Sequence, residues 1–571
     1  MASLAAAYAP RRPTETVLYE LVRQHLESFL AFTREHYEGG LPRYVEQELR
    51  AYLKCGVFSE GFTRAHCDAC GHDLLVAFSC HGRSVCPSCC GRRMANIAAH
   101  LVDRVLPDVP VRQYVLSLPY ELRRLAAFKA DVLTALARNF VEAISAVYRS
   151  RAKRAGVDSA QCGSVTFVQR FGSLNLNVHF HVLVLDGVFV RDAGGRVQFH
   201  PAPAPAAADL EAIVARAQRR CVAWLRRHGH LDDRAPEDRS NETPAQRAIE
   251  GCAAIAMGRG IVATLAREGA DDAPNDDEEE RADKPTVAVE RDGFNLHAGV
   301  RIEAGDDLGR ERLARYGARP PLSLERLRRL PGGRVAYRLK YVSRGRGKHR
   351  VMSPMEFMAR LAAIICPPRY PLVRYAGVLG PRSAWRKDVV PKPRERTGEC
   401  NRLTGEVPPP RPDGDESPPT PHRSNRPHAG SDAQSPADRP ASPGGQVDAS
   451  GPSIASIRRL APGAAEVQIL SPNIISVRHW ERLQGGALYA ATARVDWATL
   501  LRRSFAVDVL ECPKCHGRLW VIAVITERDP IRRILAHLRV PTDAPPLARA
   551  RDPTDDAGDQ EAPARLALGL S

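Results

Sequence analysis

The 571-residue chain lacks several features that would assign it to whole classes of protein. No stretch approaches the ~18 apolar residues that a membrane-spanning helix needs. The N-terminal residues, MASLAAAYAPRRPTET, lack the long apolar core that follows the basic start of a secretory signal peptide. No internal repeat of fixed period is present either. The lack of an apolar run and of a signal peptide argues against a membrane or secreted protein, and we expect a soluble protein of the cytoplasm.

Acidic residues are fewer than basic ones: 66 Asp plus Glu stand against 82 Lys plus Arg, which gives a net charge of +16 and a pI near 9.4. A basic balance of this size favours a polyanionic partner, most often nucleic acid. Arginine far outnumbers lysine, however, and GC-rich codon usage would produce the same excess. Charge alone therefore does not decide between these two readings.

Composition divides the chain into parts, and its length is enough for three or four domains. We predict a cysteine-rich helical region at 15–105, a large region of strands and helices at 110–387, a linker at 388–455, a small C-terminal domain at 456–545 and a tail at 546–571. The linker is rich in Pro, Ser, Asp, Gly and Arg and has almost no apolar residues. It cannot support a core, so we expect it, like the tail, to be disordered.

Apolar periodicity predicts the elements of these regions. Helices are expected at 92–103, 121–155, 206–230, 244–267, 307–316 and 354–364, and strands at 111–119, 164–171, 176–190 and 333–343. Asp292-Gly293 predicts the turn of a hairpin.

Six of the 14 cysteines fall between Cys55 and Cys89. Four of them form two CxxC pairs, Cys67 with Cys70 and Cys86 with Cys89. In a reducing compartment, paired cysteines indicate metal ligands before disulfides, and two pairs complete the tetrahedron that Zn²⁺ prefers. We therefore predict a structural zinc site from these four thiolates, with Cys55 and Cys80 available for a second or alternative site. Four thiolates leave no open position for water, so this zinc is not catalytic.

A third pair, Cys512 with Cys515, has only His516 close by in sequence. It either borrows ligands from elsewhere or binds no metal, and the sequence leaves both possibilities open.

The segment NVHFHVLVL (177–185) places two histidines around one phenylalanine. On a strand, His179 and His181 share one face, and two imidazoles at this spacing can hold one divalent cation. The alternative is a pair of surface histidines on an edge strand. The four apolar residues that follow favour a central strand, where burying two unpartnered imidazoles is costly. The pattern therefore favours a metal site.

SLNLNVHFHVLVLDGVF resembles the histidine–hydrophobic–histidine motif of HUH-superfamily nucleases. Together with the N-terminal cysteines, LARYGARPPLSLERL (313–327) and MSPMEFMARLAAII (352–365), it makes the chain similar to rolling-circle transposases of the insertion-sequence common-region type. The similarity returns in VDVLECPKCHGRLWVIAVIT near the C-terminus. The resemblance implies an α+β fold, in which an HUH-type domain with a mainly antiparallel sheet flanked by helices follows a helical, zinc-binding module.

The resemblance also implies the chemistry. A divalent cation, Mg²⁺ or Mn²⁺, sits on the two histidines and a third polar residue, and a tyrosine attacks the scissile phosphate to leave a 5′-phosphotyrosine and a free 3′-OH. The implied partner is DNA, at the single-stranded or hairpin ends of a mobile element, and the implied location is the nucleoid. The alternatives are a non-catalytic, zinc-dependent DNA-binding protein and an initiator of plasmid rolling-circle replication.

Tyr316 ends the helix DLGRERLARY and matches the RYxxRP pattern of the family, so it is the expected nucleophile. Some relatives carry a second tyrosine four residues earlier, where this chain has Arg312. Tyr337 and Tyr341 also have this spacing, but they lie in a strand pattern. There the two hydroxyl-bearing side chains are roughly 13 Å apart, against about 6 Å on a helix, so we interpret them as a packed sheet face.

The third metal ligand is not evident from the sequence. His297, on the strand before the tyrosine helix, and Gln169, on the strand before the histidines, are the candidates; Asp186 points to the opposite face by parity. The RYHGVL stretch of many relatives is RYAGVL (374–379) in this chain. If that histidine is chemically important, this copy is impaired.

A basic stripe follows the expected nucleophile, and we expect it to position DNA through phosphate contacts. Its members are Arg338, Lys340, Arg344, Arg346, Lys348 and Arg350. Trp385 is expected either to stack an unpaired base or to belong to the core.

Overall fold

A computed structural model describes residues 12–231, 243–257, 288–339, 348–391, 468–470 and 510–551. The α-helices are α1 (Val17–His36), α2 (Arg43–Lys54), α3 (Pro87–Arg104), α4 (Tyr120–Phe128), α5 (Ala130–Arg154), α6 (Ala207–Arg227), α7 (Pro244–Ala256), α9 (Asp307–Gly317), α10 (Pro354–Ile364), α11 (Arg386–Val389) and α14 (Arg528–His537). The strands are β1 (Phe62–Cys67), β2 (Asp73–Ala77), β3 (Val111–Ser117), β4 (Gly163–Gly172), β5 (Asn175–Leu185), β6 (Gly187–Arg191), β7 (Val197–Pro201), β8 (Ala288–Arg291), β9 (Phe294–Ile302), β10 (Leu327–Arg329), β11 (Val335–Arg338), β12 (His349–Met352), β13 (Val373–Gly377), β14 (Gln468–Leu470) and β15 (Leu519–Ile525).

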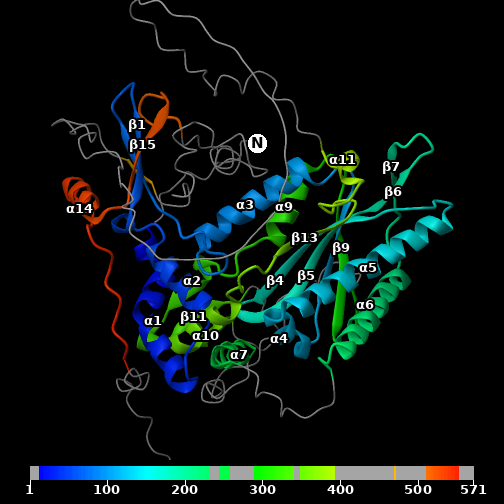
Figure 1. Ribbon diagram of the computed structural model, residues 1–571, viewed down its shortest axis with the longest axis horizontal. Helices are drawn as coiled ribbons and strands as arrows, with labels where there is room; N and C mark the ends of the chain where they lie inside the picture. The colour runs from blue at the N-terminus through cyan, green and yellow to red at the C-terminus, as the bar shows by residue number, and fades with distance from the viewer. Residues whose placement is uncertain are drawn as a thin grey trace, which may run out of the picture. The chain divides into compact units, whose positions relative to one another are not determined.

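A six-stranded sheet with strand order β13-β4-β5-β3-β9-β8 lies at the centre of the chain (Figure 1). All of its neighbouring strands are antiparallel. β5 is hydrogen-bonded on both sides, and every residue of it after Asn175 is buried. A strand covered on both faces has a nearly continuous apolar sequence, as this one has. The fold is therefore α+β with an antiparallel sheet, as the sequence predicts.

Helices cover both faces of this sheet. Phe180 and Val182 of β5 belong to one hydrophobic cluster with Phe140 of α5. Leu183, on the opposite face, belongs to a second cluster with Leu313 of α9 and with residues of α3. Because side chains alternate along a strand, the two histidines of β5 share the face of Leu183 and lie on the side of α3 and α9.

Two predicted elements are broken in the structure. Helix 121–155 is two helices, α4 and α5, and strand 176–190 is β5 and β6, which separate at Asp186. Asp186 is fully buried and accepts hydrogen bonds from Arg112 and from the hydroxyl of Tyr148. A buried carboxylate must be paired in this way. Its position beyond the end of β5, on the side of α5, agrees with the parity argument.

The predicted hairpin turn is confirmed. Asp292 and Gly293 both have positive φ angles, 50° and 76°, as a type I′ turn requires, and they join β8 to β9. The predicted helix 244–267 begins at Pro244 and is described only as far as Met257. The predicted linker lies outside the described residues beyond position 391, and so does the predicted tail beyond position 551.

A second sheet contains the cysteine-rich region. β1 forms a hairpin with β2, and β15, from near the C-terminus, pairs antiparallel with the other edge of β1. α14 packs on this sheet, where Ile531 and Leu535 form a small cluster with Phe62 and Leu75. The C-terminal residues, which the sequence assigns to a separate small domain, thus share a sheet with the N-terminal module.

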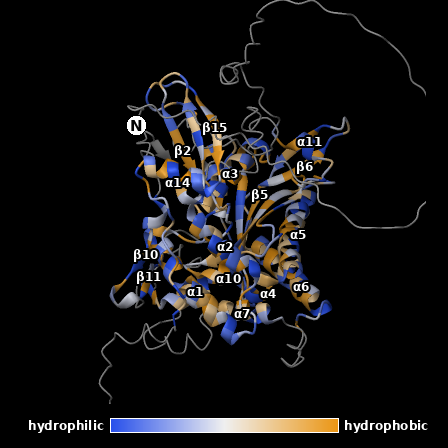
Figure 2. Cartoon of the chain, turned by 60° about the vertical axis from the view of Figure 1, so that its left-hand side comes forward, coloured by the Kyte–Doolittle hydropathy of each residue, from blue (hydrophilic) through white to orange (hydrophobic). Residues whose placement is uncertain are grey.

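α10 is buried from Glu356 to Ile364 and contacts α1 and α7. Its apolar character is visible in Figure 2. The ion pair between Glu356 and Arg360, 2.7 Å apart, is buried with it. β10, β11 and β12 form a small antiparallel sheet of their own. Within the described ranges, no helix combines the length and the apolarity needed to cross a membrane.

Candidate active site and metal centres

The two histidines lie in the middle of the central sheet. His179 is 0% and His181 is 1% exposed, and their ring centroids are 4.9 Å apart. On the neighbouring strands, Gln169 and Ser117 stand opposite His179. The predicted HxH geometry, with both imidazoles on one face of a central strand, is therefore present.

Hydrogen bonds orient both rings through Nδ1. His179 Nδ1 lies 3.1 Å from the carbonyl oxygen of Asn177, so it carries the proton and Nε2 keeps its lone pair. His181 Nδ1 lies 2.9 Å from the amide of Gln113, a group that either donates or accepts depending on how it is turned. Burial, then His179 and then Arg319 hold the pKa of His181 well below its usual value. Neutral imidazole is the form that binds metals.

Tyr316 reaches the histidines from α9. The centroid of its ring is 5.4 Å from that of His181, with the two planes at 87°. Asp306 caps the start of α9 by accepting a hydrogen bond from the backbone N–H of Gly309, 2.7 Å away. The guanidinium of Arg319, just beyond the helix, lies over the Tyr316 ring at 4.7 Å. The structure thus brings His179, His181 and Tyr316 together.

Gln169 fixes the C-terminal end of α9 to the sheet. Its amide nitrogen donates to the carbonyl oxygens of Tyr316 and Gly317, at 2.9 and 3.0 Å, and its amide oxygen accepts from Arg319 Nε at 3.2 Å. At Gly317, an added Cβ would lie only 2.7 Å from the ring of Phe167 on β4. The helix therefore approaches the sheet so closely that a larger residue at this position would have to displace the Phe167 ring or α9 itself.

The candidates for the third metal ligand are placed differently. Gln169 is adjacent to His179, but both ends of its amide are engaged with α9 and Arg319. His297 is on β9. It pairs with Val115 of β3, which pairs in turn with His181 of β5, so that Val115 lies between the two histidines. Of the His, Cys, Asp and Glu side chains that the structure describes, none completes a set of three ligand atoms with the histidine pair.

The alternative tyrosine pair is described only in part. Tyr337 lies on β11, is 3% exposed and packs in the hydrophobic core, as a packed sheet face predicts. Tyr341 lies outside the described residues.

The predicted DNA-contacting stripe is also described in part: Arg338 and Lys348 are exposed, whereas Lys340, Arg344 and Arg346 lie outside the described residues. Arg350 is engaged inside the protein, where it donates to the carbonyl of Ser173 and to the side chain of Asn175. Trp385 is half-buried under the guanidinium of Arg191, 5.0 Å from its ring.

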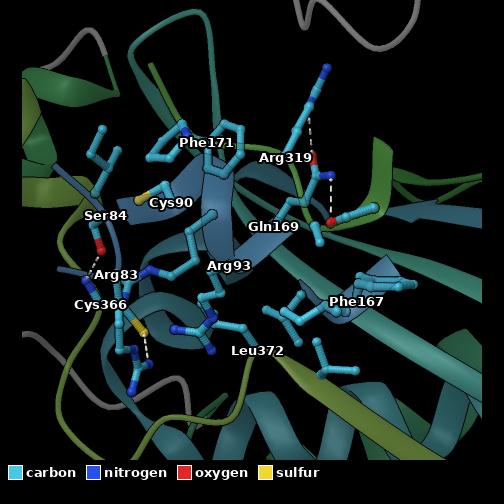
Figure 3. A pocket seen from close by; sticks show the side chains of 18 residues that line it. Arg83, Ser84, Cys90, Arg93, Phe167, Gln169, Phe171, Arg319, Cys366 and Leu372 are labelled. Atoms are coloured by element: carbon cyan, nitrogen blue, oxygen red, sulfur yellow. Dashed lines mark hydrogen bonds between the residues drawn. The ribbon is translucent and has the colours of Figure 1, made fainter. Parts of the chain in front are cut away.

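A small basic cavity opens beside α9 (Figure 3). Its lining includes the four arginines Arg83, Arg93, Arg170 and Arg319 and no carboxylate. Gln169, Phe171 and Gly317 also line it, so it adjoins the end of the helix that carries the tyrosine. A pocket with this charge suits a phosphate group. The spacing of these arginines in the sequence gives no sign that they gather.

Eight of the described cysteines form two clusters of four, and the predicted single site of two CxxC pairs is not what the structure shows. One cluster is Cys55, Cys80, Cys86 and Cys89, and the other is Cys67, Cys70, Cys512 and Cys515. Within each cluster the sulfur atoms all lie within 4.8 Å of one another. The two CxxC pairs are separated because the β1–β2 hairpin carries Cys67 and Cys70 to its turn, away from α3.

The first cluster is built around the start of α3. Cys86 lies directly before the first residue of this helix and Cys89 lies in its first turn, while Cys55 follows α2. A carboxylate oxygen of Glu48 accepts hydrogen bonds from three successive backbone N–H groups, those of residues 83–85, and so shapes the loop before α3. Thiolates at the N-terminus of a helix are favoured by its dipole. Because α3 packs against α9, this cluster supports the helix that carries Tyr316.

Ala376, where the family resemblance implies a histidine, points away from the site. It pairs with Ser164 of β4, which in turn pairs with Val184 of β5. Val184 has the opposite parity to His179 and His181, and Ala376 packs against the cluster on the side of α5. A histidine at this position would not face the histidine pair.

Comparison with known families agrees with this arrangement. A model described as "Transposase zinc-binding domain", of the IS91 type, matches residues 21–118, and a model described as "Putative transposase" matches residues 163–386. The first contains the whole of one cysteine cluster and half of the other, and the second contains both histidines and Tyr316. No curated protein and no solved structure matches the chain. The two matches together span more than half of the sequence, and the chain belongs to the IS91-type transposases, with a zinc-binding domain ahead of the transposase domain.

Proposed function

We propose that this transposase cuts and rejoins a single DNA strand, with Tyr316 as the nucleophile beside a divalent cation held by His179 and His181. The observation that supports this best is the contact between the rings of Tyr316 and His181, 5.4 Å apart. Tyr316 comes from α9 and His181 from β5. They meet because α9 packs on the face of the sheet that carries the histidines.

The chemistry of the histidine pair suits a cation. His181 Nε2 is buried and has no hydrogen-bond partner among the described residues, and the hydrogen bond at His179 Nδ1 leaves Nε2 of that ring as the ligand atom. Magnesium usually keeps several waters and takes phosphate oxygens from its substrate, so two protein ligands are compatible with it. A Mg²⁺ or Mn²⁺ ion bound there would polarise the scissile phosphate.

The residues of the chain would then carry the reaction. The Tyr316 phenol oxygen bonds to phosphorus while the bond from phosphorus to the 3′ oxygen breaks; the phenol proton passes to solvent, and the 3′ oxygen takes one up. The 5′-phosphotyrosine keeps the energy of the phosphodiester, so a later 3′-OH rejoins the strand without ATP. Arg319, stacked on the Tyr316 ring, places a fixed positive charge where the phosphate must arrive.

The basic cavity next to α9 suggests how the strand is held. The positive charge of this cavity would attract the backbone of single-stranded DNA, and Phe171 in the same lining offers a ring for stacking. Arg83 and Arg170 contribute their charge from within the protein, where they donate to the carbonyl oxygens of Tyr370 and Ala363. The substrate would be the single-stranded or hairpin end of a mobile element.

The test is covalent capture. Full-length protein is incubated with Mn²⁺ and oligonucleotides that span the two ends of the element that encodes it, labelled at either the 5′ or the 3′ end. A denaturing gel should show 3′-labelled DNA attached to the protein and a shortened, free 5′-labelled fragment. Tyr316→Phe should abolish the adduct, and Tyr337→Phe, on the small sheet, should leave it unchanged.

An adduct that survives Tyr316→Phe would refute this nucleophile. Binding of the same oligonucleotides without any adduct, with either Mg²⁺ or Mn²⁺, would favour a non-catalytic DNA-binding protein.

A further inference from the structure

We propose that Cys67, Cys70, Cys512 and Cys515 form a second structural zinc site, which joins the C-terminal segment to the N-terminal module. The two pairs are far apart in the sequence: 442 positions separate Cys70 from Cys512. The zinc-binding family model stops at residue 118 and so contains only one of the two pairs. This site is independent of the DNA-cutting chemistry proposed above.

The sulfur geometry suits zinc. Cys67 Sγ lies 3.5 Å from Cys515 Sγ, and Cys70 Sγ lies 3.5 Å from Cys512 Sγ. Tetrahedral zinc with Zn–S bonds of about 2.3 Å has sulfur–sulfur edges of about 3.8 Å. A disulfide would need about 2.05 Å, and all four cysteines are free thiols. The spacing is therefore that of a tetrathiolate metal site.

The two pairs are also built alike, as two halves of one site. In each, the N–H of the first cysteine donates to the carbonyl five residues later: Cys67 to His72 at 2.9 Å and Cys512 to Gly517 at 2.7 Å. In each, the N–H four residues later donates back to the first cysteine: Gly71 at 2.8 Å and His516 at 2.9 Å.

The residue four positions after each first cysteine also has the same conformation. Gly71 and His516 both have a positive φ, 71° and 58°. Two unrelated loops have no reason to share this pattern. A knuckle that presents two thiolates to one ion requires a tight turn of this kind.

The two cysteine pairs pack so closely that a side chain larger than that of Gly517 would press against their sulfur atoms. A Cβ added to Gly517 would lie 3.2 Å from Cys515 Sγ and 3.4 Å from Cys67 Sγ. Directly beyond the cysteines, β1 and β15 pair, with Cys67 opposite Leu519. The strands thus deliver both knuckles to the same point.

Besides its pairing with β1 and a few hydrogen bonds between residues 546–551 and α1, the described part of the C-terminal segment has only a small apolar core. The hydrophobic cluster under α14 contains only four buried residues. Trp520 and Ile522 of β15 are 48% and 46% exposed. A contact with so small a core needs an additional link, and in small units of this kind a structural metal commonly supplies it. We therefore expect zinc at this site to decide whether the C-terminal segment stays docked.

The first measurement is zinc content. Full-length protein should carry two zinc ions per chain by elemental analysis, and the Cys512→Ser/Cys515→Ser variant should carry one. Cys515→His, which keeps a zinc ligand, should retain two. The matched control Cys221→Ala/Cys252→Ala, at buried cysteines outside both clusters, should also retain two. One zinc in the wild-type protein, or two in the Cys512→Ser/Cys515→Ser variant, would overturn the proposal.

The second measurement tests docking and does not depend on a variant that folds poorly. A protease recognition sequence placed between residues 420 and 430 allows the intact, zinc-loaded protein to be cut once after folding. The two fragments should co-elute on gel filtration with zinc and separate after treatment with a chelator. Fragments that separate while zinc is bound, or that stay together after both zinc ions have been removed, would contradict the proposed role.

Discussion

The rings of His181 and Tyr316 meet nearly at right angles, at 87°, with their centroids 5.4 Å apart. This contact defines the candidate active site, because it joins the central strand of the sheet to the helix that carries the only tyrosine of the RYxxRP pattern. Three neighbours control its geometry: Gln113 orients the histidine, Gln169 holds the end of the helix, and Gly317 sets how closely the helix approaches.

Gln113→Leu should weaken metal binding without removing a ligand. The amide of Gln113 contacts His181 Nδ1 at 2.9 Å, and losing such a partner typically costs about 10- to 100-fold in metal affinity. Titration calorimetry with Mn²⁺ measures the change. Gln198→Leu, on the exposed face of β7, is the control and should bind Mn²⁺ like the wild type. Equal affinities for both variants would show that Gln113 does not support the site.

Gln169→Glu separates a positioning role from a ligand role. If Gln169 were the third metal ligand, a carboxylate at this place would tighten Mn²⁺ binding. We expect no tighter Mn²⁺ binding and less DNA adduct, because the new carboxylate could no longer donate to the carbonyls of Tyr316 and Gly317, which hold the end of α9. Leaving such groups unpaired costs about 1–3 kcal/mol, and DNA adduct formation should fall by about 5- to 150-fold. Tighter Mn²⁺ binding with retained adduct formation would instead identify Gln169 as a ligand.

Local sequence patterns anticipated the parts of the fold that local physics controls. Alternation around Phe180 places both histidines on one face of a central strand, and Asp292-Gly293 specifies the turn between β8 and β9. The predicted helix 307–316 differs from α9 by one residue at its C-terminal end, because the stop signal GARPP that follows Tyr316 is local in the sequence.

Contacts between residues far apart in the sequence could not be predicted from local patterns. The spacing predicts that the first two CxxC pairs share one ion, but the sheet formed by β14, β2, β1 and β15 separates them into different clusters and brings Cys512 and Cys515 to one of them. The break at Asp186 likewise depends on Arg112 and Tyr148, which lie far away in sequence. Gln113 could not be singled out, because nothing near it indicates that it faces a histidine.

Gly317→Ala should displace the nucleophile. The new Cβ would lie 2.7 Å from the Phe167 ring, so α9 must move outward and take Tyr316 away from His181. Overpacking of this kind costs about 1–3 kcal/mol, and we expect slower adduct formation with unchanged zinc content. Gly91→Ala, on α3, has no atom within 4 Å of the added Cβ and is the matched control. Phe167→Leu, combined with Gly317→Ala, should restore part of the rate; failure to do so would point to another cause.

Ala376→His should not improve the enzyme, although it recreates the residue found in many relatives. Position 376 pairs with Ser164 and faces the layer of α5, on the opposite side of the sheet from His179 and His181. An imidazole there cannot join the histidine pair, so Mn²⁺ affinity should stay unchanged in calorimetry. The larger side chain must fit against the α5 layer, and the stability to unfolding should fall by about 1–3 kcal/mol. A ten-fold gain in adduct formation would mean that the strand register around β13 differs in the active protein, and that this copy is impaired for want of that histidine.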